Sequence, residues 1–179
     1  MCGDPDASGR REVTRILGID PGTRVMGYGV LEERNGDLTL VDYGVLTAPS
    51  RDDVIQRLRH LYRGTMEVIA RHRPDVLAIE EPFVGTYVQA ALAIGRAQAI
   101  AILAAANENI PVFAYTPAQV KQRVANYGGS GKAQIQEMVR LQLGMASVPE
   151  PNDAADALAV AICHCCESRL AALLRQGRK

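Results

Sequence analysis

The first half of the chain alternates short apolar runs with polar turns, a pattern that predicts strands followed by a helix. Strands are expected over residues 15–20, 26–33 and 38–47, and Asn35-Gly36 between the last two is a strong hairpin turn. A long amphipathic helix is then expected to begin at Asp52 or Asp53 and to stop before Pro74. Its apolar stripe consists of Val54, Leu58, Leu61, Tyr62, Met66 and Ile69.

In the second half, single strands alternate with helices. Residues 76–80 form a short continuous apolar run typical of a buried strand, and residues 111–115 predict another. Helices are expected over residues 88–107, 118–127, 132–143 and 152–174, with Asn152 as a cap. The helix over residues 88–107 is apolar nearly all round, so it is expected to be buried in the domain or against a second subunit.

This order predicts an α/β fold, a mixed sheet that starts as an antiparallel meander and is covered by helices. A chain of 179 residues can bury a sizeable core, and we expect a single domain over residues 14–179. Residues 1–13 are rich in Gly, Asp, Arg and Ser and are expected to be disordered. The longest apolar run, residues 88–106, is interrupted by Arg96 and Gln98, so we expect a cytoplasmic protein with no membrane association.

The formal net charge is zero, which by itself argues weakly against nucleic-acid binding. The distribution of charge changes this picture. The segment between Thr116 and Ala146 contains only one acid, Glu137, but four basic residues: Lys121, Arg123, Lys132 and Arg140. Several acids lie at the ends of predicted elements instead, and divalent cations bound there would make the working charge positive.

Asp20 is the first of these acids, at the end of the apolar run Ile16 to Ile19 and before the turn Pro21-Gly22. An acid on a buried strand is costly unless its charge is used, although an Asp in this position could also be a turn former. Glu80 ends the fourth strand, and it reaches the same edge if the first and fourth strands are neighbours.

Asp153 and Asp156 are three residues apart at the start of the last helix, so they share one face. Acids in a first helical turn are commonly structural, because they suit the helix dipole. Taken together, however, the four carboxylates would repel one another unless Mg²⁺ or Mn²⁺ ions bind between them. Two such ions are the recurring device for phosphodiester hydrolysis.

Four motifs resemble those of the RuvC family of Holliday junction resolvases, in the family's order and spacing from Arg15 to His164. The first motif is Ile16-Leu17-Gly18-Ile19-Asp20-Pro21-Gly22-Thr23, followed by Gly27-Tyr28-Gly29. The second is Ala78-Ile79-Glu80-Glu81-Pro82-Phe83. The basic region is Gln119-Val120-Lys121-Gln122 with Gly131-Lys132, and the last motif is Asp153-Ala154-Ala155-Asp156-Ala157-Leu158-Ala159.

The resemblance implies a ribonuclease H-like fold, a mixed five-stranded sheet flanked by helices. It implies a homodimer that cuts four-way DNA junctions with paired symmetric nicks, using Mg²⁺, with two ions per site, or Mn²⁺ as the alternative. The products would carry 5′-phosphate and 3′-hydroxyl ends, and branch-migration proteins of the same pathway would be partners.

The resemblance also implies roles for individual residues. Asp20, Glu80, Asp153 and Asp156 would be the catalytic acids that bind the metal. Lys121 and Lys132 would contact phosphates, Phe83 would stack on junction bases, and Arg123 of the same basic region is expected to contact DNA. The loop from Val84 to Ala90 is less polar than in many relatives, so its DNA contacts are open. Some relatives have His at the position of Asp153.

Three other functions compete with this reading. An actin-like or sugar-kinase ATPase shares the Gly-Ile-Asp-x-Gly-Thr pattern but needs a second large domain. An inactive junction-binding module would not need all four acids. A related nuclease that processes ribosomal RNA fits less well with Lys121, Lys132 and the pair of Asp153 and Asp156.

Two further patterns resemble a metal cluster and a phosphate-binding loop, but the spacing of their residues does not favour either site. Cys163-His164-Cys165-Cys166 lacks a second ligand pair, so we expect buried or half-buried thiols on a core helix. The Gly-rich run before Lys132 lacks the spacing of a Walker A motif.

Overall fold

The computed structural model describes residues 13–82, 88–125 and 131–176. The five strands are β1 (Thr14–Asp20), β2 (Val25–Arg34), β3 (Asp37–Thr47), β4 (Val76–Glu80) and β5 (Val112–Tyr115). The five helices are α1 (Val54–His72), α2 (Val88–Asn107), α3 (Pro117–Ala125), α4 (Lys132–Gln142) and α5 (Asn152–Gln176). The predicted order of elements is confirmed, and most ends agree within two residues. The disorder expected for residues 1–13 falls almost entirely outside the described residues.

All five strands form one mixed sheet in the order β3-β2-β1-β4-β5. β1, β2 and β3 are antiparallel neighbours, whereas β4 runs parallel to both β1 and β5. At the turn between β2 and β3, Asn35 has a φ of 53° and Gly36 a φ of 100°. Positive φ at both central residues is what a two-residue hairpin of this kind requires.

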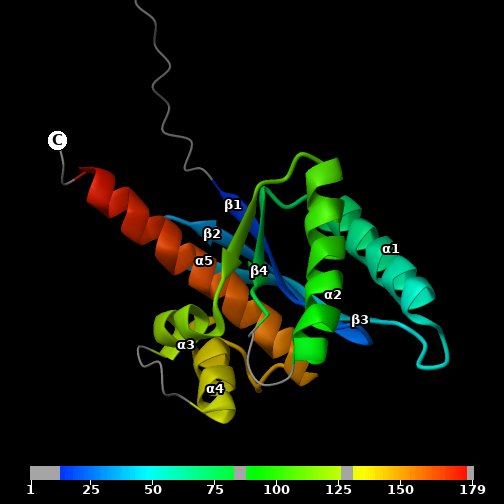
Figure 1. Ribbon diagram of the computed structural model, residues 1–179. Coiled ribbons are helices and arrows are strands. Elements are labelled where there is room, and N and C mark those ends of the chain that lie inside the picture. Colours follow the sequence, from blue (N-terminus) through cyan, green and yellow to red (C-terminus); the bar gives the residue numbers. More distant parts are fainter. Residues whose placement is uncertain (1–12, 83–87, 126–130, 177–179) are drawn as a thin grey trace, which may run out of the picture.

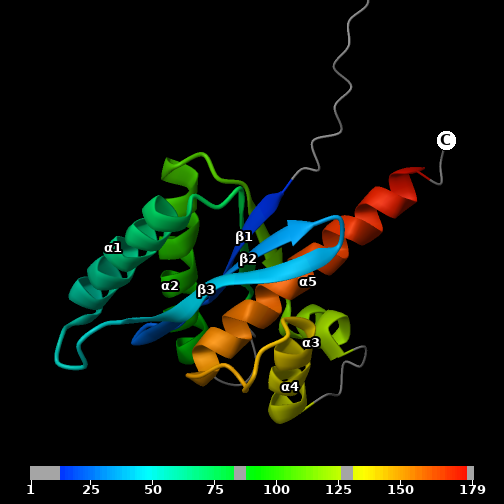
Figure 2. The same cartoon turned by 180° about the vertical axis from the view of Figure 1, so that it is seen from behind.

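Helices cover both faces of the sheet (Figures 1 and 2). Leu17 and Ile19 of β1 pack in a core that includes residues of α1 and α2. Ile16 packs in the opposite core, with residues of α3, α4 and α5. Because side chains alternate between the faces of a strand, the even-numbered positions of β1 face α5. Asp20 continues that alternation onto the α5 face.

The start and end of α1 follow its predicted signals. The Asp53 side chain accepts a hydrogen bond from Gln56 N at 2.8 Å, and Arg73 ends the helix in the left-handed conformation just before Pro74. The buried face consists of Leu61, Thr65, Val68 and Ile69. Thr65 was not expected there, and it is accommodated because its hydroxyl donates to Leu61 O at 2.8 Å.

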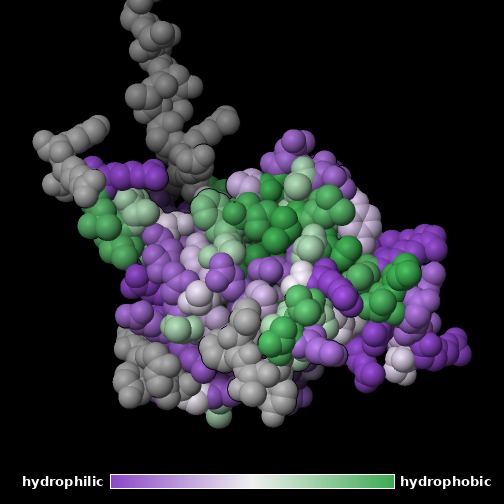
Figure 3. Space-filling model, in the orientation of Figure 1, coloured by the Kyte–Doolittle hydropathy of each residue, from purple (hydrophilic) through white to green (hydrophobic). Residues whose placement is uncertain are grey.

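Only one side of α2 is buried by the rest of the described chain. The buried side consists of Ala91, Ala97, Ala101, Ala104 and Ala105. Val88, Leu92 and Leu103 are 56%, 60% and 51% exposed. Figure 3 shows hydrophobic residues gathered on this side of the molecule. The helix therefore has an apolar face that nothing in the described residues covers.

α2 and residues Asn152–Arg175 of α5 are both long and apolar enough to cross a membrane by length and composition alone. The central part of α5 has another explanation, because residues 154–163 other than Asp156 are buried, many of them against the sheet. Core helices of this kind give the same signal as spanning helices, so the signal is weak.

Candidate active site

Asp20 and Glu80 lie at the same edge of the sheet because their strands are parallel neighbours in register. Ile19 pairs with Ile79, so β1 and β4 end side by side. Val76 and Ala78 face the α5 core while Leu77 and Ile79 face the other core, and this alternation places Glu80 on the α5 face. Both predicted acids therefore face the same helix.

α5 brings the second pair of acids to this edge through close contact with the strands. Asp20 pairs with Gly27 of β2, and a Cβ at Gly27 would lie 1.9 Å from the carbonyl oxygen of Asp153. A Cβ at Gly18 would likewise lie 2.2 Å from Ala157 O. Only glycine leaves room for the helix backbone at these two positions. The first turn of α5 therefore lies directly beside Asp20.

The four acids act on one another electrostatically, and Asp20 is affected most. Burial is the largest cause that raises the pKa of Asp20 to about 8, followed by the charges of Glu80, Asp156 and Asp153. Lys132 opposes this shift. Burial is also the largest cause that raises the pKa of Glu80, followed by Asp156. A hydrogen bond with the Asp20 carboxyl, together with Lys121 and Lys132, acts in the opposite direction.

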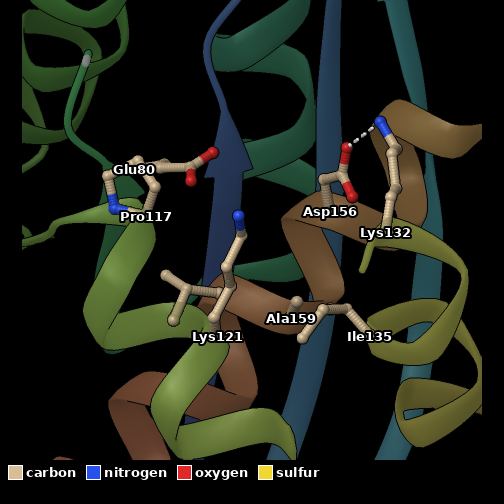
Figure 4. Close-up of a pocket in the computed structure, with 8 residues that line it drawn as sticks. Glu80, Pro117, Lys121, Lys132, Ile135, Asp156 and Ala159 are labelled. Atoms are coloured by element: carbon tan, nitrogen blue, oxygen red, sulfur yellow. Dashed lines mark hydrogen bonds and ion pairs between the residues drawn. The ribbon is translucent and has the colours of Figure 1, made fainter. Parts of the chain in front are cut away.

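A pocket of about 280 Å³ lies between α3, α4 and α5 at this edge (Figure 4). Its lining residues are Glu80, Pro117, Val120, Lys121, Lys132, Ile135, Asp156 and Ala159. Lys121 points toward the Glu80 carboxylate, and Lys132 Nζ donates to Asp156 Oδ2 at 2.7 Å. The predicted basic residues thus meet two of the predicted acids in one cavity.

α3 and α4 hold these lysines in place by simple local rules. Thr116 precedes Pro117 and accepts a hydrogen bond from Gln119 N at 3.2 Å, which fixes the start of α3. Val120 and Ile135 are buried and form apolar walls next to the lysines. Sequence patterns do not mark these walls, because isolated apolar residues on short helices give no functional signal.

The donor chemistry of the site fits a hard divalent cation, since all four acids offer carboxylate oxygens. The high pKa of Asp20 also reflects negative charge that Lys132 neutralises only in part. In the described residues, however, no three acidic, His or Cys side chains converge closely enough to hold an ion. Asp156 is paired with Lys132 instead.

Of the other predicted DNA-binding residues, Arg123 is held away from the pocket by an ion pair, and Phe83 cannot be placed. Arg123 Nε donates to Glu167 Oε1 at 2.6 Å on α5, so its charge is already paired and its predicted DNA contact has no support from the structure. Phe83 lies outside the described residues, as do residues 84–87 of the following loop.

The cysteine-rich segment of α5 is part of the core, as expected. Cys163 and Cys165 are buried free thiols, and burial raises the pKa of both. His164 contacts the hydroxyl of Tyr115 through Nδ1 at 2.8 Å and Ser168 Oγ through Nε2 at 3.2 Å. The contact with Tyr115 ties α5 to β5, whose end leads directly into α3.

Comparison with known proteins gives a consistent result. Residues 16–164 match the family model of crossover junction endodeoxyribonuclease RuvC. The RuvC of Dehalococcoides mccartyi strain BAV1 is 54% identical over 91% of this chain and 98% of its own. The RuvC of Chloroflexus aurantiacus is 55% identical over 84% of this chain and 92% of its own.

A solved structure described as Thermus thermophilus RuvC in complex with Holliday junction substrate has a TM-score of 0.83. It is 33% identical, and the match covers 88% of this chain and 96% of that one. The predicted ribonuclease H-like fold is thereby confirmed. From the order of its motifs, its sheet and these relatives, the chain belongs to the RuvC family of crossover junction endodeoxyribonucleases.

Proposed function

We propose that this protein resolves four-way DNA junctions by paired, symmetric nicks in homologous recombination and DNA repair. The observation that carries the proposal is the set of four acids around Asp20, with Lys121 and Lys132 in the adjoining pocket. The relative whose structure was solved in complex with Holliday junction substrate supports the choice of substrate. Acids beside lysines suit a phosphodiester, because the lysines meet phosphate oxygens as point charges.

The RuvC family comprises divalent-metal-dependent nucleases. We propose that Asp20, Glu80, Asp153 and Asp156 hold Mg²⁺, two ions per site, with Mn²⁺ as the alternative. Such ions, when bound, activate the attacking water and stabilise the leaving oxygen. A metal ion at Asp156 would compete with Lys132 for this carboxylate, and a displaced Lys132 Nζ would be free to contact a DNA phosphate.

The chain's own residues position the reacting groups. Lys121 and Lys132 flank the pocket and orient the scissile phosphate. The buried Val120 and Ile135 exclude water from one side of the pocket, which strengthens the electrostatic interactions inside it. Water attacks phosphorus in line and the bond to the 3′ oxygen breaks, so the products carry a 5′-phosphate and a 3′-hydroxyl.

The remaining proposals concern the whole protein. A homodimer would explain paired nicks, because a two-fold protein matches a two-fold junction, and the exposed apolar face of α2 is suited to such a contact. We also propose that residues 14–179 act as one domain in the cytoplasm and that branch-migration proteins work with it. A stacking role for Phe83 remains a proposal from the family resemblance.

The test uses a labelled synthetic four-way junction, a linear duplex of the same sequence and an RNA stem. The wild-type protein is incubated with each substrate in Mg²⁺, Mn²⁺ or EDTA. We expect paired nicks in the junction alone, and only with a metal. Asp20→Asn should bind the junction and fail to cut it, whereas the exposed Asp37→Asn should cut normally. Absence of junction cleavage with either ion would refute the proposal.

A further inference from the structure

A second concentration of positive charge lies on the opposite side of the sheet edge from Lys121 and Lys132. Residues 48–73 contain six arginines and only three acids in a chain whose formal net charge is zero. Two of those acids are engaged locally. Asp53 caps α1 by accepting from Gln56 N, and Asp52 pairs with His60 at 3.2 Å.

Four exposed arginines remain near the catalytic edge, and we call them the arginine ridge: Arg24, Arg51, Arg59 and Arg63. In the described part of the chain, no side-chain hydrogen bond or ion pair engages any of them. Glu67, the third acid, lies one helical turn beyond Arg63 and makes no ion pair among these residues. The ridge therefore carries unneutralised charge.

The backbone places the ridge at the same edge as Asp20. Arg24 lies in the turn after β1, and its carbonyl accepts from Ala48 N at 2.9 Å. This bond ties the turn to the segment that carries Arg51 and leads into α1. The ridge then runs up α1, away from the edge, on the side opposite the buried Leu61, Thr65, Val68 and Ile69. Figure 3 shows a largely hydrophilic surface over the α1 side of the molecule.

The dimensions of the ridge match a DNA backbone. At 1.5 Å per residue, Arg59 lies about 9 Å and Arg63 about 15 Å along the axis from the cap of α1. One DNA strand places a phosphate about every 3.4 Å along the duplex, so the ridge spans roughly four to five phosphates. Arginines that point into solvent suit such a partner, because they bind phosphate oxygens in a forked geometry.

We propose that the arginine ridge binds the sugar-phosphate backbone of a duplex arm that leaves the catalytic edge over α1. This inference rests on the proposed junction-cutting function. DNA at the site would then meet lysines of α3 and α4 on one side and arginines beside α1 on the other. The ridge contributes affinity without reading sequence, since phosphates carry no base identity.

The test measures junction binding by fluorescence anisotropy in Ca²⁺ over a range of salt concentrations. In the proposed dimer, the double variant Arg59→Ala/Arg63→Ala removes two phosphate contacts from each subunit, so the slope of log K against log salt should become shallower by about 4. Its affinity at low salt should fall about tenfold or more. Hydroxyl-radical footprinting should show lost protection of a run of phosphates on two symmetry-related arms, with protection at the branch point retained.

The matched control is Arg34→Ala/Arg71→Ala, which removes two exposed arginines far from the catalytic edge and should leave slope and footprint unchanged. Thermal unfolding of both variants checks that they fold. An unchanged salt slope for Arg59→Ala/Arg63→Ala, or a loss of junction affinity equal to that of the control, overturns the proposal. An acidic protein surface would then be the alternative partner of the ridge. Failure of the wild-type protein to bind the junction at all would instead count against the proposed function.

Discussion

Asp20 derives its properties from its neighbours. Its carboxyl group ends a buried strand, and three other acids approach it from β4 and α5. A carboxyl group with a pKa of about 8 is half protonated at slightly basic pH when no metal is bound. Its ionised form is therefore unfavourable until a cation binds. Buried, mutually repelling carboxylates of this kind lower the stability of the fold, but they prepare the site to bind a cation.

The raised pKa gives a prediction for stability. The folded protein holds a proton on Asp20 up to about pH 8, whereas the unfolded chain loses it near pH 4. Without divalent ions, the free energy of unfolding should therefore fall as the pH rises between these values, by up to about 1.4 kcal/mol per pH unit for this group. Urea unfolding in EDTA at a series of pH values measures this free energy.

Asp20→Asn should reduce that pH dependence and raise the stability at pH 8, because no buried charge has to form. The exposed Asp37→Asn serves as the control and should keep the wild-type dependence. Equal pH dependence in wild type and Asp20→Asn would contradict the electrostatic description of the site.

Lys132 competes with a metal for Asp156. The ammonium group sits 2.7 Å from Asp156 Oδ2, and the lysine side chain is 58% exposed. Pairs this exposed contribute about 0.5–1 kcal/mol. Lys132→Met should therefore bind Mn²⁺ about two- to fivefold more tightly in isothermal titration without DNA, although it should bind the junction more weakly.

Lys121→Met is the comparison for Lys132→Met. Lys121 makes no ion pair among the described residues, so its removal should change Mn²⁺ affinity less. Unchanged or weaker Mn²⁺ binding by Lys132→Met would show that the ion pair does not compete with the metal.

At the scale of elements, the close packing of α5 on β1 and β2 forms the site. Alternate glycines in these strands leave room for the helix backbone, which carries Asp153 and Asp156 to the ends of β1 and β4. The same contact helps to bury residues 154–163 of α5 other than Asp156, so the core and the site depend on one helix position.

Gly27→Ala tests this packing. Its Cβ would lie 1.9 Å from Asp153 O, so α5 has to move away from the strand. Overpacking of this kind costs about 1–3 kcal/mol, and a shift of about 1 Å in the acids can lower cleavage roughly a hundredfold. Thermal unfolding and single-turnover cleavage measure the two effects.

Gly95→Ala is the control for stability, because nothing lies within 4 Å of its Cβ position. It should be as stable as the wild type or slightly more so. Wild-type cleavage and stability in Gly27→Ala would mean that α5 does not need this close contact.

At the scale of the whole molecule, the exposed face of α2 predicts self-association. Leu92 and Leu103 lie on this face and are 60% and 51% exposed. Leu92→Glu/Leu103→Glu should convert the proposed dimer into monomers in sedimentation velocity and abolish paired nicking. A buried charge at both positions would prevent the apolar contact.

Leu173→Glu/Leu174→Glu, at the far end of α5, changes two leucines that are 64% and 62% exposed and should leave the dimer intact. A monomeric wild-type protein, or equal effects of the two double variants, would argue against α2 as the interface.

The sequence by itself determined the elements, since their signals are local. Alternation and apolar runs gave the strands, Asn35-Gly36 gave the hairpin, and Asp53 with Pro74 bounded α1. Asp20 and Glu80 were also visible as candidates, because a charge at the end of a buried strand conflicts with its surroundings. Their identity as one site needed the family motifs as well.

Only the tertiary structure decided which charges meet and which are free. Lys132 and Arg123 look alike in sequence, yet Lys132 pairs with Asp156 in the pocket while Arg123 pairs with Glu167. Helical spacing alone did not reveal the glycine contacts beneath α5 or the unpaired arginines beside α1. Such contacts depend on distances between residues far apart in the chain, and local patterns carry no information about those distances.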